Sequence, residues 1–184
     1  ARYLTNLLQR RVDGLLLVPA RSAPGPVQWL QKRGMPVVLL DRRVSDTPVD
    51  AVRCNSEEGA CNLTRLLLAL GPRRIAILGG PFQVSTARER LDGFRRAHRE
   101  AGLEPEPALI VQGQYTLASG TSMMQQALTV VPRPTAIFAA NNFIAIGAFR
   151  ALRAAGLRVP DDVAIVAFDD LPEKLVLDPF LTVA

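Results

Sequence analysis

The sequence predicts an α/β protein whose parallel sheets are flanked by helices. Short apolar runs alternate with amphipathic segments of helical length along the 184 residues, a pattern typical of repeated strand–helix–strand units. Residues 134–170 show one such unit in full, with only a short return from the helix to the second strand. This order favours parallel pairing. Polar residues follow most of the strands, as expected where parallel strands end at one edge of a sheet.

The elements follow from apolar runs, caps and glycines. The strands are expected at residues 12–18, 37–40, 49–54, 75–78, 109–111, 135–138, 163–168 and from 181 onward. The helices are expected at residues 1–10, 26–33, 56–70, 85–101, 118–128 and 141–155. Ser56 and Asn141 stand where side chains cap helix starts. Four of the helices stop at glycines, which favour the left-handed backbone that ends a helix: Gly34, Gly71, Gly102 and Gly156.

Three of the longer predicted helices have one apolar face toward a core. The helix of residues 56–70 carries Ala60, Leu63, Leu67 and Leu70 at helical spacing. The helix of residues 85–101 carries Ala87, Leu91, Phe94 and Ala101 in the same way. The helix of residues 141–155 carries Ile144, Ala148, Leu152 and Ala155. His98 lies among arginines, so we expect it to be exposed.

Composition excludes several classes of protein. Apolar residues make up 48% of the chain, which is enough for a sizeable core, and no apolar run reaches the length of a membrane span. The formal net charge is +5, but the arginines are scattered over helices, which favours a solvated surface over a nucleic-acid patch. Cys54 and Cys61 match no metal spacing and are expected to be reduced core or boundary residues.

Five residues near strand ends form the candidate site. They are Asp41, Arg90, Tyr115, Asn141 and Asp169. Carboxylates accept hydrogen bonds from adjacent hydroxyls, a guanidinium donates in a fixed fork, and an aromatic face packs on apolar C–H groups, so this set suits a sugar. Each residue alone also has a structural explanation as a cap, a surface cation or a packing residue. Thr86, Asn142 and Phe168 are expected at the rim.

Six sequence runs carry a resemblance to a known family. In chain order they are VDGLLLVP, PVVLLDR, RRIAILGGP, STARERLDGF, AIFAANNFIAIGAFRAL and LRVPDDVAIVAFDD. In these runs the chain resembles the core domain of lactose-repressor-type (LacI/GalR family) bacterial transcription regulators. The resemblance implies a two-lobed, type I periplasmic-binding-protein-like fold that is incomplete at both ends here. Residues 1–54 would be part of the N-terminal lobe, and residues 55–184 the C-terminal lobe up to a second hinge crossing near residues 182–184.

The resemblance also implies a function and site roles. A sugar-like effector in the cleft between lobes would control operator DNA binding by a helix-turn-helix that is absent from this chain. The complete protein would be a homodimer. The reduced cysteines are consistent with the cytoplasm, and we expect no cofactor, metal or membrane contact. Arg90 matches the effector-binding arginine of R-x-x-G-F, and Asp41, Tyr115, Asn141 and Asp169 match family positions at strand ends.

One departure bears on the effector. Asn142 stands where the family usually has an aspartate. An amide has nearly the same shape as a carboxylate but carries no charge. This indicates an effector that needs less negative charge around it, such as a phosphorylated or acidic sugar, while neutral drift at a rim position remains the alternative.

Three other interpretations compete. An enzyme lacks support, because no serine–histidine pair, phosphate-binding loop or metal cluster is recognisable. A secreted or periplasmic sugar-binding protein shares the expected fold, but the RERLDGF and VAFDD motifs favour the regulator branch. A purine effector is a further alternative to a sugar.

Overall fold

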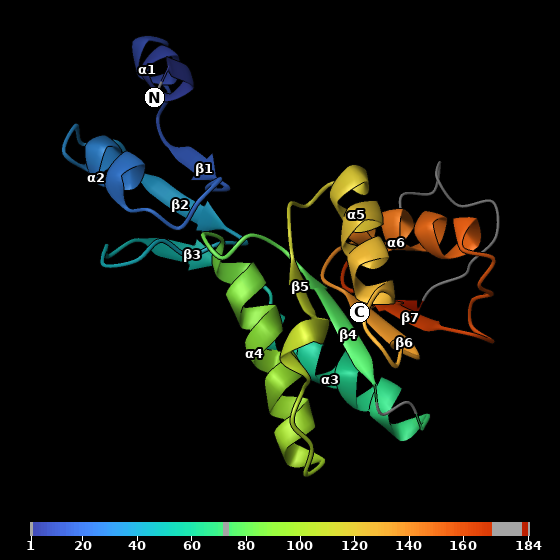
Figure 1. Ribbon diagram of the computed structural model, residues 1–184. Coiled ribbons are helices and arrows are strands. Elements are labelled where there is room, and N and C mark those ends of the chain that lie inside the picture. Colours follow the sequence, from blue (N-terminus) through green and yellow to red (C-terminus); the bar gives the residue numbers. More distant parts are fainter. Residues whose placement is uncertain (1, 72–73, 171–181, 184) are drawn as a thin grey trace. The chain divides into compact units, whose positions relative to one another are not determined.

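The computed structural model describes residues 2–71, 74–170 and 182–183, and it divides into two compact units (Figure 1). The first unit comprises Ala1–Asn55 together with Gln83–Thr86, and the second comprises Ser56–Phe82 and Ala87–Ala184. Two hydrogen bonds explain why residues 83–86 belong to the first unit. The amide of Ser22 donates to the carbonyl of Gln83 at 2.8 Å, and the amide of Arg43 donates to the Ser85 hydroxyl at 2.9 Å.

The first unit is a small parallel sheet with helices. Its elements are α1 (Arg2–Gln9), β1 (Leu15–Leu17), α2 (Gly25–Gln31), β2 (Val37–Leu40) and β3 (Asp50–Val52). The strands pair in the order β1-β2-β3, all parallel. Helix α2 contacts β2, and Val27, Leu30 and Leu39 form the buried positions there. Leu16 and Val52 remain largely exposed.

The second unit is a parallel sheet with helices on both faces. Its elements are α3 (Ser56–Ala69), β4 (Ile75–Gly79), α4 (Ser85–Glu100, whose first two residues group with the first unit), η1 (Pro107–Leu109), β5 (Ile110–Gln112), α5 (Leu117–Leu128), β6 (Ala136–Ala139), α6 (Asn142–Ala154), β7 (Ala164–Ala167) and β8 (Thr182–Val183). The strand order is β5-β4-β6-β7-β8. Every neighbouring pair is parallel, so the predicted α/β class with parallel sheets is confirmed.

Strand alternation splits the core of the second unit into two layers. Ala76 and Leu78 of β4 face a cluster shared with α5 and α6. Ile75 and Ile77 of the same strand face a cluster shared with α3 and α4. Figure 1 shows these two helix pairs on opposite sides of the sheet. Burial on both faces explains why the strands are continuous apolar runs rather than alternating ones.

Helices α5 and α6 approach each other through glycines. A Cβ atom on Gly120 would lie 2.4 Å from the carbonyl oxygen of Ile144, and one on Gly147 would lie 2.2 Å from that of Leu117. No side chain fits at such distances. The Thr121 hydroxyl also lies 3.1 Å from the carbonyl oxygen of Gly147 and donates to it. The backbones of α5 and α6 are therefore in direct contact, and both helices pack on the same face of the sheet.

The predicted cap Asn141 agrees with the structure, whereas the predicted cap Ser56 and some predicted core positions do not. Ser56 is the first residue of α3, and its buried hydroxyl has no hydrogen-bond partner among the described residues. Asn141 accepts a hydrogen bond from the amide of Ile144 at 2.9 Å, as its predicted N-cap role requires. The predicted core positions Leu70, Ala101 and Ala155 are exposed, because each lies just past the end of its helix. Of the two free cysteines, Cys61 is buried and Cys54 is exposed.

His98 is buried, and the expectation that it is exposed was wrong. Its exposed fraction is 2%, its Nδ1 lies 2.9 Å from the carbonyl oxygen of Phe94, and its ring centroid lies 4.3 Å from that of Phe94. The spacing of four residues from Phe94 places it on the same helix face. Burial lowers the pKa of His98, against smaller opposing effects of the Phe94 hydrogen bond and Glu104.

We expect stability to fall as the pH drops through the ordinary pKa of histidine, about 6.5. The unfolded chain then binds a proton that the folded protein does not, because the folded pKa is the lower one. Urea denaturation at pH 7.5 and pH 5.5 should show this loss. Since His98 is the only histidine, His98→Leu should flatten the pH dependence in this interval. An equal loss in the variant would contradict the assignment.

Candidate functional site

Four adjacent strands of the second unit end beside one another. The order β5-β4-β6-β7 places the segments after these strands in a row: Tyr115 after β5, Gly80 after β4, Asn141 after β6 and Asp169 after β7. The carboxyl edge of a parallel sheet is where open α/β folds bind ligands. The structure therefore brings Tyr115, Asn141 and Asp169 to one edge.

Arg90 joins two of these strand ends. It lies on α4 and is 5% exposed. Its Nη1 donates to the carbonyl oxygen of Ala140 after β6 and lies 3.6 Å from Oδ2 of Asp169 after β7. Its guanidinium carbon stands 3.7 Å from the centre of the Phe168 ring. A cation over a desolvated aromatic ring is attracted by about 2 kcal/mol, so the ring helps to hold the buried charge.

The hydrogen-bonding capacity of Arg90 is only partly used. Its Nε is buried and has no hydrogen-bond partner among the described residues. An unpaired buried donor costs about 1–3 kcal/mol. The distance of 3.6 Å to Asp169 is also long for a direct hydrogen bond. The arrangement therefore leaves donor capacity for oxygen atoms of a ligand.

Both strand-end aspartates adopt a left-handed backbone. Asp169 has φ 70° and Asp41 has φ 66°, a conformation that aspartate tolerates better than most residues. Asp169 is half-exposed beside Arg90. Asp41 belongs to the first unit, where it follows β2 and its Oδ2 lies 3.5 Å from Nε of Arg42. Strained turns of this kind cluster at functional sites.

Tyr115 requires a glycine on the neighbouring strand end. A Cβ atom on Gly80 would lie 2.2 Å from Cζ of Tyr115. The half-buried ring thus lies directly on the backbone that follows β4. Phe168 has a similar requirement, because a Cβ atom on Gly59 would lie 2.8 Å from its Cε2. Small residues on α3 and after β4 therefore make room for the two rings.

The two asparagines have separate partners. Asn141 is buried and caps α6 through its Oδ1. Asn142 donates from Nδ2 to the carbonyl oxygen of Asp170 at 2.8 Å. Thr86, expected at the rim, is 2% exposed at the start of α4 and groups with the first unit.

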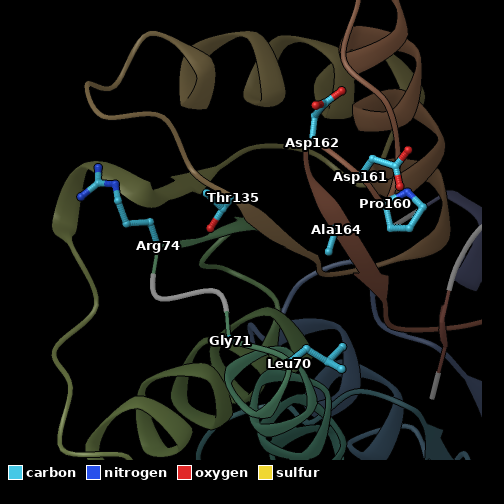
Figure 2. A pocket seen from close by; sticks show the side chains of 8 residues that line it. All are labelled: Leu70, Gly71, Arg74, Thr135, Pro160, Asp161, Asp162 and Ala164. Atoms are coloured by element: carbon cyan, nitrogen blue, oxygen red, sulfur yellow. The ribbon is translucent and has the colours of Figure 1, made fainter.

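A pocket of about 620 Å³ lies at the opposite edge of the same sheet (Figure 2). It is lined by Leu70, Gly71, Arg74, Thr135, Pro160, Asp161, Asp162 and Ala164. Arg74 donates from Nε and Nη2 to the carbonyl oxygen of Pro132 and pairs through Nη1 with Glu106. The backbone amide and guanidinium of Arg158 hold the pKa of Asp162 below its usual range. The charged groups of Arg74 and Asp162 are already paired with other residues, so this pocket offers few polar groups for binding a ligand.

The described residues show neither a metal cluster nor a membrane span. No three His, Cys, Asp or Glu side chains converge among residues 2–71, 74–170 and 182–183. In the same ranges, no helix is long and apolar enough to cross a bilayer.

Comparison with known proteins decides the family. The family model described as "Periplasmic binding proteins and sugar binding domain of LacI family" matches residues 1–184. The chain belongs to the LacI family. The ribose operon repressor of Escherichia coli K12 is 35% identical over 182 residues, which is 98% of this chain and 55% of that protein. The E. coli O1:K1 repressor PurR is 36% identical over 98% of this chain and 53% of its own length.

Solved LacI-family structures share the fold. A regulatory protein of the LacI family from Chloroflexus aggregans superposes with a TM-score of 0.86 at 34% identity, covering 99% of this chain and 66% of that one. The transcriptional regulator CelR in complex with cellobiose gives a TM-score of 0.85 at 38% identity over 92% of this chain and 53% of that one. These relatives are transcriptional regulators rather than enzymes. The chain spans about half the length of the curated relatives that it matches.

Some residues of the candidate site were not predicted from the sequence. The carbonyl group of Ala140 is the acceptor for Arg90, the carbonyl group of Asp170 is the acceptor for Asn142, and Gly59 and Gly80 make room for the rings. Backbone acceptors carry no signal in the side-chain pattern. The Gly79–Gly80 pair after a strand was the one available sign of a close approach.

Proposed function

We propose that this chain is the effector-sensing core of a bacterial LacI-type transcription regulator. It binds a sugar or sugar derivative at the carboxyl edge of the second unit, and binding controls operator recognition by an N-terminal domain outside these 184 residues. Family membership and the repressor names of its relatives support this proposal. Catalysis is not part of the proposed role.

The state of Arg90 is the observation that carries the proposal. A buried guanidinium with an unpaired Nε lies beside a half-exposed carboxylate. A sugar hydroxyl can accept from Arg90 and donate to Asp169 at the same time, because a hydroxyl is both donor and acceptor. Tyr115 offers an aromatic face further along the same edge. In this proposal Asn141 contributes mainly by fixing the start of α6.

The proposal keeps Asp41, Thr86, Asn142 and Phe168 in supporting roles. Asp41 would contribute a carboxylate from the first unit, and Phe168 would support Arg90 through its ring. Residues 1–54 and 55–184 act as parts of the two lobes of the effector domain. The full protein is proposed to be a cytoplasmic homodimer, since a two-fold axis matches paired half-sites in operator DNA.

The effector class is proposed as sugar-like, with an anionic form included. One relative is named a ribose operon repressor, and one solved relative is a complex with cellobiose. Arg90 can serve as the counter-charge of a phosphate or carboxylate. The neutral amide of Asn142 adds no negative charge that would repel such a group.

A thermal-shift screen of the full-length protein tests this function. The panel contains D-ribose, ribose 5-phosphate, cellobiose, gluconate and hypoxanthine, each at millimolar concentration. We expect one sugar or sugar acid to raise the melting temperature, because a ligand that binds only the folded state stabilises it. The same compound should change binding to DNA fragments from the protein's own promoter. If only hypoxanthine raised the melting temperature, the effector would be a purine rather than a sugar. If no compound raised the melting temperature, the result would contradict the proposal.

A further inference from the structure

The side chain of Asn142 connects the start of α6 to the turn after β7. Its Nδ2 donates to the carbonyl oxygen of Asp170 at 2.8 Å, and its Oδ1 accepts from the amide of Phe143 at 2.8 Å. The first partner can only accept and the second can only donate. These partners fix the orientation of the amide. A carboxylate could satisfy the second contact but not the first.

The turn that Asn142 holds carries Asp169. Asp169 has a left-handed backbone, and its carboxylate is half-exposed at 3.6 Å from Arg90. The amide of Phe168 donates to the carbonyl oxygen of Ala139 at 3.0 Å, which is the last ladder contact between β6 and β7. Beyond that contact, two side chains hold the turn. Arg90 lies beside the carboxylate of Asp169, and Asn142 donates a hydrogen bond to the backbone carbonyl group of Asp170.

We propose that Asn142 is a positioning residue that fixes the Asp169–Asp170 turn, so that the Asp169 carboxylate is presented to the effector in one orientation. This inference rests on the proposed function, because it assigns Asp169 to the effector. Ordering the turn before binding reduces the entropy that binding must remove. The donor group of the amide, rather than its lack of charge, is what this position requires.

The isosteric change Asn142→Asp separates this role from a merely structural one. Aspartate retains the acceptor for the amide of Phe143 but places a carboxylate against the carbonyl oxygen of Asp170. An acidic residue in the first turn of α6 also interacts favourably with the helix dipole. We therefore expect the variant to melt at or above the wild-type temperature while the turn becomes looser.

Hydrogen exchange of the full-length protein measures the turn directly. We expect the amides of residues 169 and 170 to exchange roughly 2- to 10-fold faster in Asn142→Asp and in Asn142→Ala, the range expected for one lost hydrogen bond. The control is Asn62→Asp, which adds the same charge on an exposed part of α3 and keeps the acceptor for Arg65. The control should exchange like the wild type at residues 169 and 170.

Two results would overturn the proposal. Wild-type exchange at residues 169 and 170 in both Asn142 variants would show that the contact does not order the turn. Faster exchange in Asn142→Asp with wild-type exchange in Asn142→Ala would assign the effect to repulsion between charges.

Calorimetry then connects the turn to binding. D-ribose and cellobiose are titrated into the wild type and the three variants. For a sugar that binds the wild type, both Asn142 variants should bind roughly 2- to 10-fold more weakly, and the Asn62 control should not change. Unchanged affinity in the Asn142 variants would contradict the positioning role. If neither sugar binds the wild type, D-ribose and cellobiose are excluded as effectors, and the exchange comparison still decides whether Asn142 orders the turn.

Discussion

Arg90→Ala should weaken effector binding tenfold or more. The guanidinium is buried between Phe168 and the carbonyl oxygen of Ala140, so its position is defined before a ligand arrives. Hydrogen bonds to a charged group contribute about 1.5–3 kcal/mol each, and 1.4 kcal/mol corresponds to a factor of ten in affinity. Calorimetry with the sugar identified by the thermal-shift screen measures the loss.

Two further variants test whether the loss of affinity comes from the hydrogen-bond donors of Arg90. Arg90→Met retains an apolar chain over Phe168 but has no hydrogen-bond donors. Its affinity for the effector should therefore fall as much as that of Arg90→Ala, while its melting temperature should stay closer to that of the wild type. Arg95→Ala removes an exposed arginine from the same helix and should bind normally. Unchanged affinity in both Arg90 variants would remove Arg90 from the site and with it the main support for the proposed function.

Gly147→Ala should destabilise the second unit by about 2–3 kcal/mol. The new Cβ atom would lie 2.2 Å from the carbonyl oxygen of Leu117 and 2.7 Å from the amide nitrogen of Thr121. Both are backbone atoms, so relief requires that α5 and α6 move apart. Alanine favours a helix interior over glycine by about 1 kcal/mol, which offsets part of the steric cost but not the whole of it.

Urea denaturation followed by circular dichroism tests this effect. Gly25→Ala is the matched control, because the same substitution at the start of α2 meets no atom within 4 Å. The control should be as stable as the wild type or slightly more stable. If Gly147→Ala matched the control, the close contact between the two helices would not contribute to stability.

The sequence by itself determined the α/β class and the positions of most elements. Apolar runs that are buried on both faces predicted the parallel strands, and caps such as Asn141 placed the helix starts. These signals are local, since a strand or a cap depends on residues within a few positions. The polar residues after the strands also predicted the edge where Arg90 and Asp169 meet.

Only the tertiary structure decided which partners these residues have. Arg90 and Ala140 are 50 residues apart in the chain, Asn142 and Asp170 are 28 apart, and no local pattern specifies such pairs. His98 was misassigned because the arginines around it suggested a solvated face, while the fold buries the face that it shares with Phe94. Residues 83–86 joined the first unit through hydrogen bonds to Ser22 and Arg43. Periodicity gives the orientation of each residue on its own element, but contacts between elements depend on how the whole chain packs.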